Sequence, residues 1–332
     1  MAEAFKEWIG TELVRTMAKH LRRVHAAFPR ERFVKVATAG LAELELKARV
    51  VHVADALAAT LPSSFSQAAK VLEQSLAPAR SDTDLSKLVP CDAGLAGWAV
   101  WPMTDYVARY GIKHPKRALR CLHACTQRNT AEYAIRPFLI EHRELTMATL
   151  QGWLRDSNPH VRRLVSEGTR PRLPWGIQLQ HLVADPTPTF GFLQKLQDDD
   201  SEYVRRSVAN HLNDIAKDHP GHVAEWLEQN LPGASVERRA MLRHASRTLI
   251  KRGDGRVLKA WGLANPLRGE VLFSISPNSV AQGDAVMLSV SLQSGAKKAQ
   301  ALMVDYVVHH VKKSGATSAR TWKGWQLTLQ AG

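Results

Sequence analysis

The chain has 332 residues, enough for one large domain or two ordinary ones. Apolar residues make up 45% of it and charged residues 23%, which is close to the globular norm and excludes a disordered chain. The 45 Lys and Arg residues outnumber the 31 Asp and Glu residues, so the net charge is +14 at pH 7. A charge of this size indicates an anionic partner, with nucleic acid as the first candidate.

Cysteine content and hydropathy indicate the compartment. Three cysteines cannot form a disulfide framework, which fits a reducing cytosol. The N-terminus has no apolar signal core, and no apolar run approaches the roughly 20 residues that span a bilayer. Cys121 and Cys125 lack a second pair and read as buried thiols in a helix, not as zinc ligands. We therefore expect a soluble cytoplasmic protein with no membrane association, metal or cofactor.

The first four fifths of the chain have helical periodicity. From Ala4 to about Gly262 the apolar residues recur every three or four positions, which places them on one face of each predicted helix. A second run, from about residue 33 to 61, ends at Pro62. The first run consists of Phe5, Ile9, Leu13, Met17, Leu21 and Val24.

The pattern changes after Asn265-Pro266. Residues 271–276, 285–292, 302–308 and 322–329 are β-branched or alternating runs separated by turn residues, which predicts short antiparallel strands. Such strands are typical of a small β-sandwich, although a closed sandwich has about seven. We expect a β-sandwich-like domain over residues 266–332 and leave open whether it is complete.

The helical region contains an internal repeat. The segment Asp156–Val165 returns as Asp199–Val208, an offset of 43 residues, and a weaker copy follows at 236–241. A period of about 40 to 47 residues with two helices per unit is typical of HEAT-like solenoids. Neighbouring units share one core and curve into a concave surface. The sequence thus predicts a mainly α protein with a HEAT-like α-solenoid over residues 1–265.

Arginines in these copies have two interpretations. In the first interpretation, the Asp of each copy forms an ion pair with the first Arg of the same copy, Asp156 with Arg162 and Asp199 with Arg205. In the second, these two Arg residues contact DNA phosphates. The second Arg lies about 100° further round the helix, where it is better placed for a ligand. Two lysines beside Pro115 could follow a phosphate strand or form a solvated face. The further candidates for DNA contact are Arg163, Arg206, Arg238, Arg239, Lys113 and Lys116.

Two longer blocks carry a family resemblance. Residues 161–175 and 204–214 are similar to the AlkC branch of the DNA alkylation repair glycosylases. The resemblance covers essentially the whole chain, including a C-terminal immunoglobulin-like domain that the related AlkD branch lacks. It implies a monomer, associated with the bacterial nucleoid when on DNA, that excises N3-alkylated bases from double-stranded DNA without a metal. The main substrate would be 3-methyladenine, with 3-methylcytosine left open.

The resemblance also implies two catalytic carboxylates, Glu167 and Asp214. An N3-alkylated base is cationic and leaves readily, so the sugar limits the reaction. As the glycosidic bond lengthens, C1′ becomes cationic, and a carboxylate close to C1′ can stabilise that charge. A carboxylate can also orient or deprotonate the water that attacks C1′. Which acid has which role stays open. Without the resemblance, each would read as a solvated or salt-bridged residue.

Further site residues follow from the same blocks. Trp175 is implied to stack on the deoxyribose, with a core position as the alternative. Glu132 is implied to contact the lesion or the sugar, and pairing with Arg136 is nearly as well supported by the i, i+4 spacing. His211 and His244 occupy matching positions in successive copies and are interpreted as hydrogen-bonding residues outside the catalytic set.

Four residues depend on weaker likenesses. Trp101 and Asp105 have the spacing of the Trp and Asp that line the lesion site in the AlkD branch. That branch has a second Trp where this chain has Asn210, so the aromatic arrangement differs. Asn210 and Arg170 are assigned to DNA contact.

Two rival functions remain. A non-catalytic HEAT scaffold that binds DNA, RNA or an acidic protein would explain the repeats and the charge, but not the two blocks. A glycosylase with another lesion range, such as 7-methylguanine, would explain both. The β domain could brace the solenoid or contact DNA, and the sequence does not decide between these roles.

Overall fold

The computed structural model describes residues 5–84, 87–263 and 265–332. The predicted start of the helical region at Ala4 lies outside these ranges. The chain forms two compact units: Met1–His219 with Ala234–Ala245, and Pro220–Gly233 with Ser246–Gly332. The second unit therefore includes helices as well as the strands.

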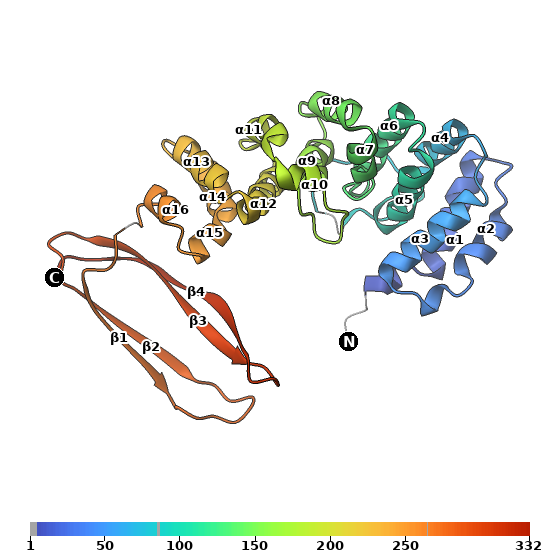
Figure 1. The fold of residues 1–332 in the computed structure, drawn as a ribbon. Coiled ribbons are helices and arrows are strands. Elements are labelled where there is room, and N and C mark those ends of the chain that lie inside the picture. The colour runs from blue at the N-terminus through green and yellow to red at the C-terminus, as the bar shows by residue number, and fades with distance from the viewer. Residues whose placement is uncertain (1–4, 85–86, 264) are drawn as a thin grey trace. The chain divides into compact units, whose positions relative to one another are not determined.

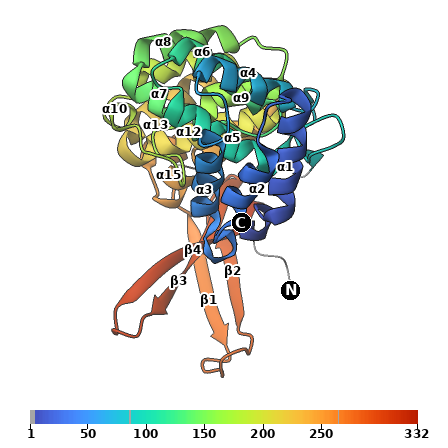
Figure 2. The ribbon, with the colours of Figure 1, turned by 90° about the vertical axis from the view of Figure 1, so that its right-hand side faces the viewer.

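The first unit is built of short helices in two layers. Figure 1 shows α4, α6, α8 and α11 along one edge and α3, α5, α9 and α12 along the other, and Figure 2 keeps α4, α6 and α8 on the same upper edge. The α-helices are α1 (Thr11–Val24), α2 (Arg30–Thr38), α3 (Leu46–Ala58), α4 (Phe65–Ser75), α5 (Val100–Tyr110), α6 (Pro115–Thr126), α7 (Arg136–Glu141), α8 (Arg143–Trp153), α9 (Pro159–Gly168), α10 (Gln180–Ala184), α11 (Phe190–Leu196), α12 (Glu202–Asp218) and α14 (Val236–Ala245). The 3-10 turns are Phe5–Trp8, Leu41–Glu43, Gly97–Ala99 and Thr187–Thr189.

Helix boundaries follow local sequence signals. α1 buries Met17 and Leu21 of the predicted run, and also Val14, which was not part of it. Phe5, at the start of the predicted run, lies in a 3-10 turn and is 61% exposed. The predicted run from 33 to 61 is instead broken, because Gly40 adopts a left-handed φ of 67° between α2 and α3. α6 and α9 each begin with a proline, whose missing N–H costs nothing in the first turn.

The 43-residue repeat corresponds to stacked helices. α9 contains the first copy and α12 the second; α9 packs against α12, and α12 packs against α14. Val161, Leu164 and Val165 of α9 are fully buried. The stacking explains the repeat, because each helix covers the apolar side of its neighbour.

The expected pairing of Asp and Arg within one copy is wrong. Arg162 donates two hydrogen bonds, of 2.6 and 2.8 Å, to the carboxylate of Asp199 in the next copy. The Asp156 carboxylate is used elsewhere: it accepts from the backbone N–H of Asn158 at 2.8 Å and lies 2.8 Å from His123 Nε2. Arg162 contacts Asp156 through the backbone carbonyl oxygen, to which it donates at 2.8 Å. The ion pair therefore joins consecutive copies.

The second unit combines three helices with two hairpins. Its elements are α13 (Pro220–Asn230), α15 (Arg247–Lys251), α16 (Gly255–Ala260), β1 (Gly269–Ser276), β2 (Met287–Ser294), β3 (Gln300–Val311) and β4 (Thr317–Leu329). β1 pairs antiparallel with β2, from Gly269 opposite Ser294 to Ser276 opposite Met287. β3 pairs antiparallel with β4, with a register shift between Val304 and Asp305.

The four strands confirm the predicted change of structure after residue 266. They form two separate two-stranded sheets. Large apolar side chains on them, such as Phe273 and Trp325, stay about half exposed. Within the described residues the hairpins therefore do not close over a common apolar core, as a complete sandwich would.

Candidate active site

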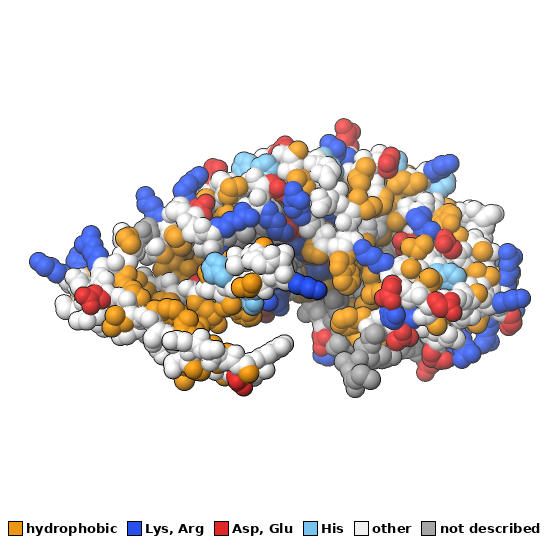
Figure 3. Space-filling model, turned by 60° about the horizontal axis from the view of Figure 1, so that its bottom comes forward, with side chains coloured by type: hydrophobic (Ala, Val, Ile, Leu, Met, Phe, Trp, Pro, Cys, Tyr) orange, Lys and Arg blue, Asp and Glu red, His pale blue; other side chains and the backbone are white. Residues whose placement is uncertain are grey.

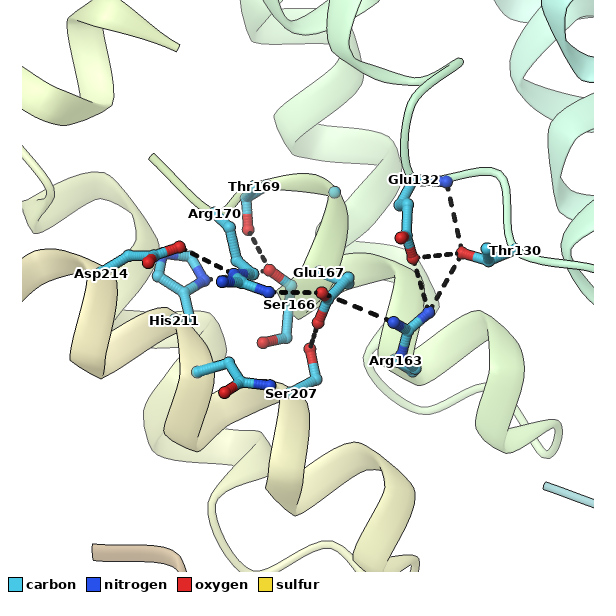
Figure 4. Close-up of polar contacts among 12 residues, drawn as sticks. Thr130, Glu132, Arg163, Ser166, Glu167, Thr169, Arg170, Ser207, His211 and Asp214 are labelled. Carbon is cyan, nitrogen blue, oxygen red and sulfur yellow. Dashed lines mark hydrogen bonds and ion pairs between the residues drawn. The ribbon is translucent and has the colours of Figure 1, made fainter. Parts of the chain in front are cut away.

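α9 and α12 bring two carboxylates to one guanidinium group. Arg170 Nη1 donates to Glu167 Oε1 at 2.6 Å, and Arg170 Nε donates to Asp214 Oδ2 at 2.8 Å. Figure 4 shows the Arg170 side chain between the two acids, which come from neighbouring helices. The acids are not on equivalent turns, because the repeat equivalent of Glu167 is Asn210, one turn before Asp214 on α12. Arg170, just after the end of α9, spans this difference.

Both acids are covered by partners. Glu167 is 4% exposed, Asp214 1% and Arg170 7%. Ser207 donates to Glu167 Oε2 at 2.6 Å, and Lys217 Nζ donates to Asp214 Oδ1 at 2.8 Å. A ligand can therefore reach a carboxylate oxygen only if one of these contacts opens.

The charges around Glu167 favour its ionised form. Burial alone raises the pKa of a carboxyl group, because the charged form loses hydration. The guanidinium groups of Arg163 and Arg170 outweigh this effect, and together with the Ser207 hydrogen bond they lower the pKa of Glu167 below its ordinary value.

A third acid extends the network. Arg163 Nη1 donates to Glu132 Oε2 at 2.7 Å, and its Nη2 lies 3.5 Å from Glu167 Oε1 (Figure 4). Thr130 Oγ1 also donates to Glu132 Oε2, at 2.5 Å. The Arg163 guanidinium lies 4.7 Å from the Tyr203 ring centroid. Glu132 thus pairs with Arg163, and Arg163 is engaged inside the protein.

The network therefore alternates acids and cations across α9, α12 and the segments just before α7 and just after α9. Burial lowers the pKa of Arg163, but Glu132 and Glu167 outweigh this effect and raise it. Arg136, the alternative partner of Glu132, donates instead to four backbone carbonyls.

The predicted aromatic residues meet at a separate cavity in the same unit. It has a volume of about 340 Å³, and its wall includes Trp101, Asp105, Tyr133 and Trp175. Trp101 stacks on Tyr133 with ring centroids 5.4 Å apart. Burial raises the pKa of Asp105, although Arg109 Nε lies only 2.9 Å away. The Trp175 side chain is largely exposed.

The predicted DNA-contact residues fall into two groups. Some are engaged with protein groups: Arg205 donates to the carbonyls of Asp199 and Asp200, Arg238 pairs with Asp198, and Asn210 lies 2.9 Å from His244 Nε2. Others are exposed side chains on the surface of the first unit. These are Arg206, Lys113 and Lys116. Arg239 is exposed as well, and it also interacts with protein groups.

Several partners of the acids were not predicted. Ser207, Lys217 and Thr130 fix the orientation of carboxylates that the sequence did identify. Only Lys217 had a usable signal, since it lies three positions after Asp214 on the same predicted helix. His211 is fully buried, and its Nδ1 donates to the Ser166 carbonyl at 3.0 Å, as expected of a structural histidine.

Two negative findings concern the described part of the chain. It contains no group of three or more His, Cys, Asp and Glu side chains that could hold a metal ion. None of the helices resolved there has both the length and the apolar character needed to cross a membrane.

Comparisons with known proteins agree with this architecture. Residues 126–249 match the family model for DNA alkylation repair enzyme, and residues 270–332 match that for the C-terminal Ig-like domain of the uncharacterised protein YhaZ. The chain is 34% identical over 320 residues to the uncharacterized protein YhaZ of Bacillus subtilis (strain 168), covering 96% of this chain and 84% of that protein.

A solved structure extends the match to the fold. The alkylpurine DNA glycosylase AlkC of Pseudomonas fluorescens, bound to DNA containing an abasic site analog, is 36% identical with a TM-score of 0.89. The match covers 99% of this chain and 88% of that one. With its helical stack and its C-terminal Ig-like segment, the chain belongs to the AlkC-like DNA alkylation repair family.

Proposed function

We propose that the chain is a DNA glycosylase that hydrolyses the N-glycosidic bond of cationic N3-alkylated bases, chiefly 3-methyladenine, in double-stranded DNA. The observation that carries the proposal is the convergence of Glu167 and Asp214 on Arg170 in a member of this family. The solved AlkC relative, an alkylpurine DNA glycosylase bound to DNA, supports the substrate class.

The chemistry needs negative charge near C1′ rather than a strong acid. The C1′–N bond breaks, the base takes the electron pair and leaves neutral, and water adds to C1′ with loss of a proton. A carboxylate beside C1′ stabilises the developing cation, and a second carboxylate can accept the proton from water. In a site this buried, charge interactions are stronger than in water.

Arg170 has to move for this chemistry. Its guanidinium bonds both acids, so the sugar can approach only after Arg170 releases at least one of them. We propose that the cationic sugar then replaces Arg170 as counter-ion. Glu167 would keep Arg163 and Ser207 as partners, which hold the carboxylate in place.

DNA binding is proposed to be mainly electrostatic. Figure 3 shows Lys and Arg side chains near the middle of the helical part, and acidic and basic side chains interleaved at its N-terminal end. Affinity that rests on phosphate contacts falls steeply with salt and depends little on sequence. The exposed Arg206, Lys113 and Lys116 are the proposed phosphate contacts.

Base release from methylated duplex DNA tests the proposal. Duplex DNA treated with a methylating agent is incubated with the protein, and the released bases are identified by mass. We expect 3-methyladenine from the wild type, and none above background from Glu167→Gln or Asp214→Asn with DNA binding retained. Both variants keep the side-chain shape and remove the charge, and each replaces one accepting oxygen by a donating NH2 group.

Asp218→Asn is the matched control. Asp218 lies on the same helix as Asp214, one turn further on, and pairs with Arg172 at the surface. This variant should still release 3-methyladenine well above background, because the Asp218 carboxylate bonds Arg172, in the loop that carries Trp175, and not the two acids or Arg170. Binding without base release by the wild type would instead favour a non-catalytic scaffold. Release of 7-methylguanine alone would favour a different lesion range.

A further inference from the structure

Trp175 has a backbone conformation that L-amino acids rarely adopt. It is the single non-glycine residue of positive φ in the described ranges, with φ 66°. Its indole is 64% exposed. For a bulky side chain this region is strained, and it persists only where neighbouring groups hold it. Neighbouring groups must therefore hold the Trp175 backbone in this conformation, and we call the side chains that do so its anchors.

The first anchor is Lys47 of α3. Its Nζ donates to the carbonyl oxygen of Trp175 at 2.6 Å, across 128 positions of sequence. The same Nζ lies 6.0 Å from the centroid of the indole ring. Lys47 thus fastens the strained residue itself, and it does so from a helix outside the repeats that carry Glu167 and Asp214.

The second anchor is Arg136 of α7, a fully buried arginine. Its Nε donates to Ile177 O at 2.5 Å, and its Nη1 donates to Gly168 O at 2.9 Å and Arg170 O at 2.8 Å. Burial lowers the pKa of Arg136 to about 10, which leaves it charged at neutral pH. One side chain therefore holds both ends of the segment that contains Trp175.

Gly176 shows how closely the segment rests on this anchor. A Cβ at position 176 would lie 3.1 Å from Leu173 Cδ2 and 3.3 Å from Arg136 Cδ. The backbone N–H of Leu179 also donates to Pro171 O at 3.2 Å, which closes the loop. Residues 171–179 thus form a seated loop whose exposed side chains are Pro174, Trp175, Ile177 and Gln178.

We infer that Lys47 and Arg136 are positioning residues that hold loop 171–179 so that the Trp175 indole is presented to DNA in advance of binding. The inference rests on the proposed function and on the role that the family resemblance implies for Trp175, which is to stack on the deoxyribose. Neither residue was identified from the sequence as part of the site. Both act through the loop, and the same Arg136 contact sets the backbone of Arg170, between the two acids.

A double-mutant cycle tests the role of Lys47. Removing one hydrogen bond of this kind should lower kcat/KM of Lys47→Gln about three- to tenfold. In a Trp175→Ala background, Lys47→Gln should cause no further loss. Lys70→Gln removes an exposed lysine from α4 and serves as the matched charge control, with no expected effect. An equal loss in both backgrounds would show that Lys47 acts independently of Trp175, which overturns the inference.

Limited proteolysis gives a readout that does not depend on catalysis. Trypsin can cut the loop after Arg172, whereas the Arg170–Pro171 bond resists it. Lys47→Gln should be cut faster after Arg172 than the wild type or Lys70→Gln. Unchanged cleavage would contradict the positioning role. If the wild type releases no base, the proposed function fails, but the cleavage rates still decide whether Lys47 fixes the loop.

Arg136→Lys is the complementary variant. It keeps the charge but cannot reach all the carbonyls that the guanidinium reaches, so we expect faster cleavage at the same bond and a loss of kcat/KM that Trp175→Ala masks. Its folding is checked by circular dichroism. If this variant does not fold, the Lys47 cycle and its cleavage rates remain decisive.

Discussion

Substitution of Arg170 and of Arg172 compares how much a buried ion-pair network and a surface ion pair contribute to the free energy of unfolding. Each guanidinium makes two short hydrogen bonds to carboxylates: Arg170 at 2.6 and 2.8 Å to Glu167 and Asp214, and Arg172 at 2.6 and 2.8 Å to Asp218. The environments differ, since the Arg172 and Asp218 side chains are 31% and 26% exposed and those of the Arg170 cluster are nearly inaccessible. The two variants therefore compare a buried bridge between two acids with a partly exposed pair between one Arg and one Asp.

Arg170→Met should destabilise the protein by about 3 kcal/mol. Removing one partner of a buried ion pair costs roughly 3–5 kcal/mol, because the remaining charge loses its compensation. The lower end applies here, since Glu167 keeps Ser207 and Asp214 keeps Lys217. Arg172→Met should cost about 0–1 kcal/mol, as exposed pairs do.

Urea unfolding at pH 7.5, followed by far-ultraviolet circular dichroism, measures both variants. Base release by Arg170→Met should fall as well, because Arg170 helps to lower the pKa of Glu167. Equal unfolding free energies for the two variants would refute the reasoning, since the buried acids would then not need their counter-ion.

Two further predictions concern pH and salt. Burial lowers the pKa of His211 from 6.5 to about 4, so the unfolded chain binds a proton that the folded protein excludes, and stability rises with pH between these values by about 3 kcal/mol. His211→Asn retains a donor for Ser166 O. Urea unfolding at pH 4.5 and 7.5 should show that this variant has lost most of the increase in unfolding free energy between the two pH values. If the increase is the same as in the wild type, it comes from other groups. Arg206→Gln should weaken binding to undamaged duplex and reduce the slope of log Kd against log salt by about 0.9. If fluorescence anisotropy gives Arg206→Gln the same slope of log Kd against log salt as the wild type, Arg206 does not contact a phosphate.

Periodicity was enough to predict the main elements. The repeat identified α9 and α12 as stacked neighbours, and the alternating runs located all four strands. The break at Gly40 was missed because the apolar spacing continues across it, and spacing alone does not report a left-handed residue.

Side-chain partners were harder to predict than side-chain positions. Arg170 was predicted to contact DNA, but it lies between Glu167 and Asp214. Arg162 was predicted to pair with Asp156 of its own copy, but it pairs with Asp199 of the next copy. A long side chain can reach groups on several neighbouring elements, and the choice depends on the distance and angle between helices. The anchors of Trp175 had no sequence signal for the same reason, since Lys47 lies on α3 and the first repeat copy begins only after α8.

The alternation of acids and cations in the site has a consequence for encounters with intact DNA. Glu132, Glu167 and Asp214 are matched by Arg163, Arg170 and Lys217. Unmatched, three anions would repel the phosphates of any duplex that approached. Because each anion is paired with a cation, the cluster has little net charge and little effect at long range. The protein therefore keeps the long-range attraction for DNA that its net charge of +14 provides. Under the proposed function, the anionic character needed for chemistry emerges only where a sugar displaces a guanidinium.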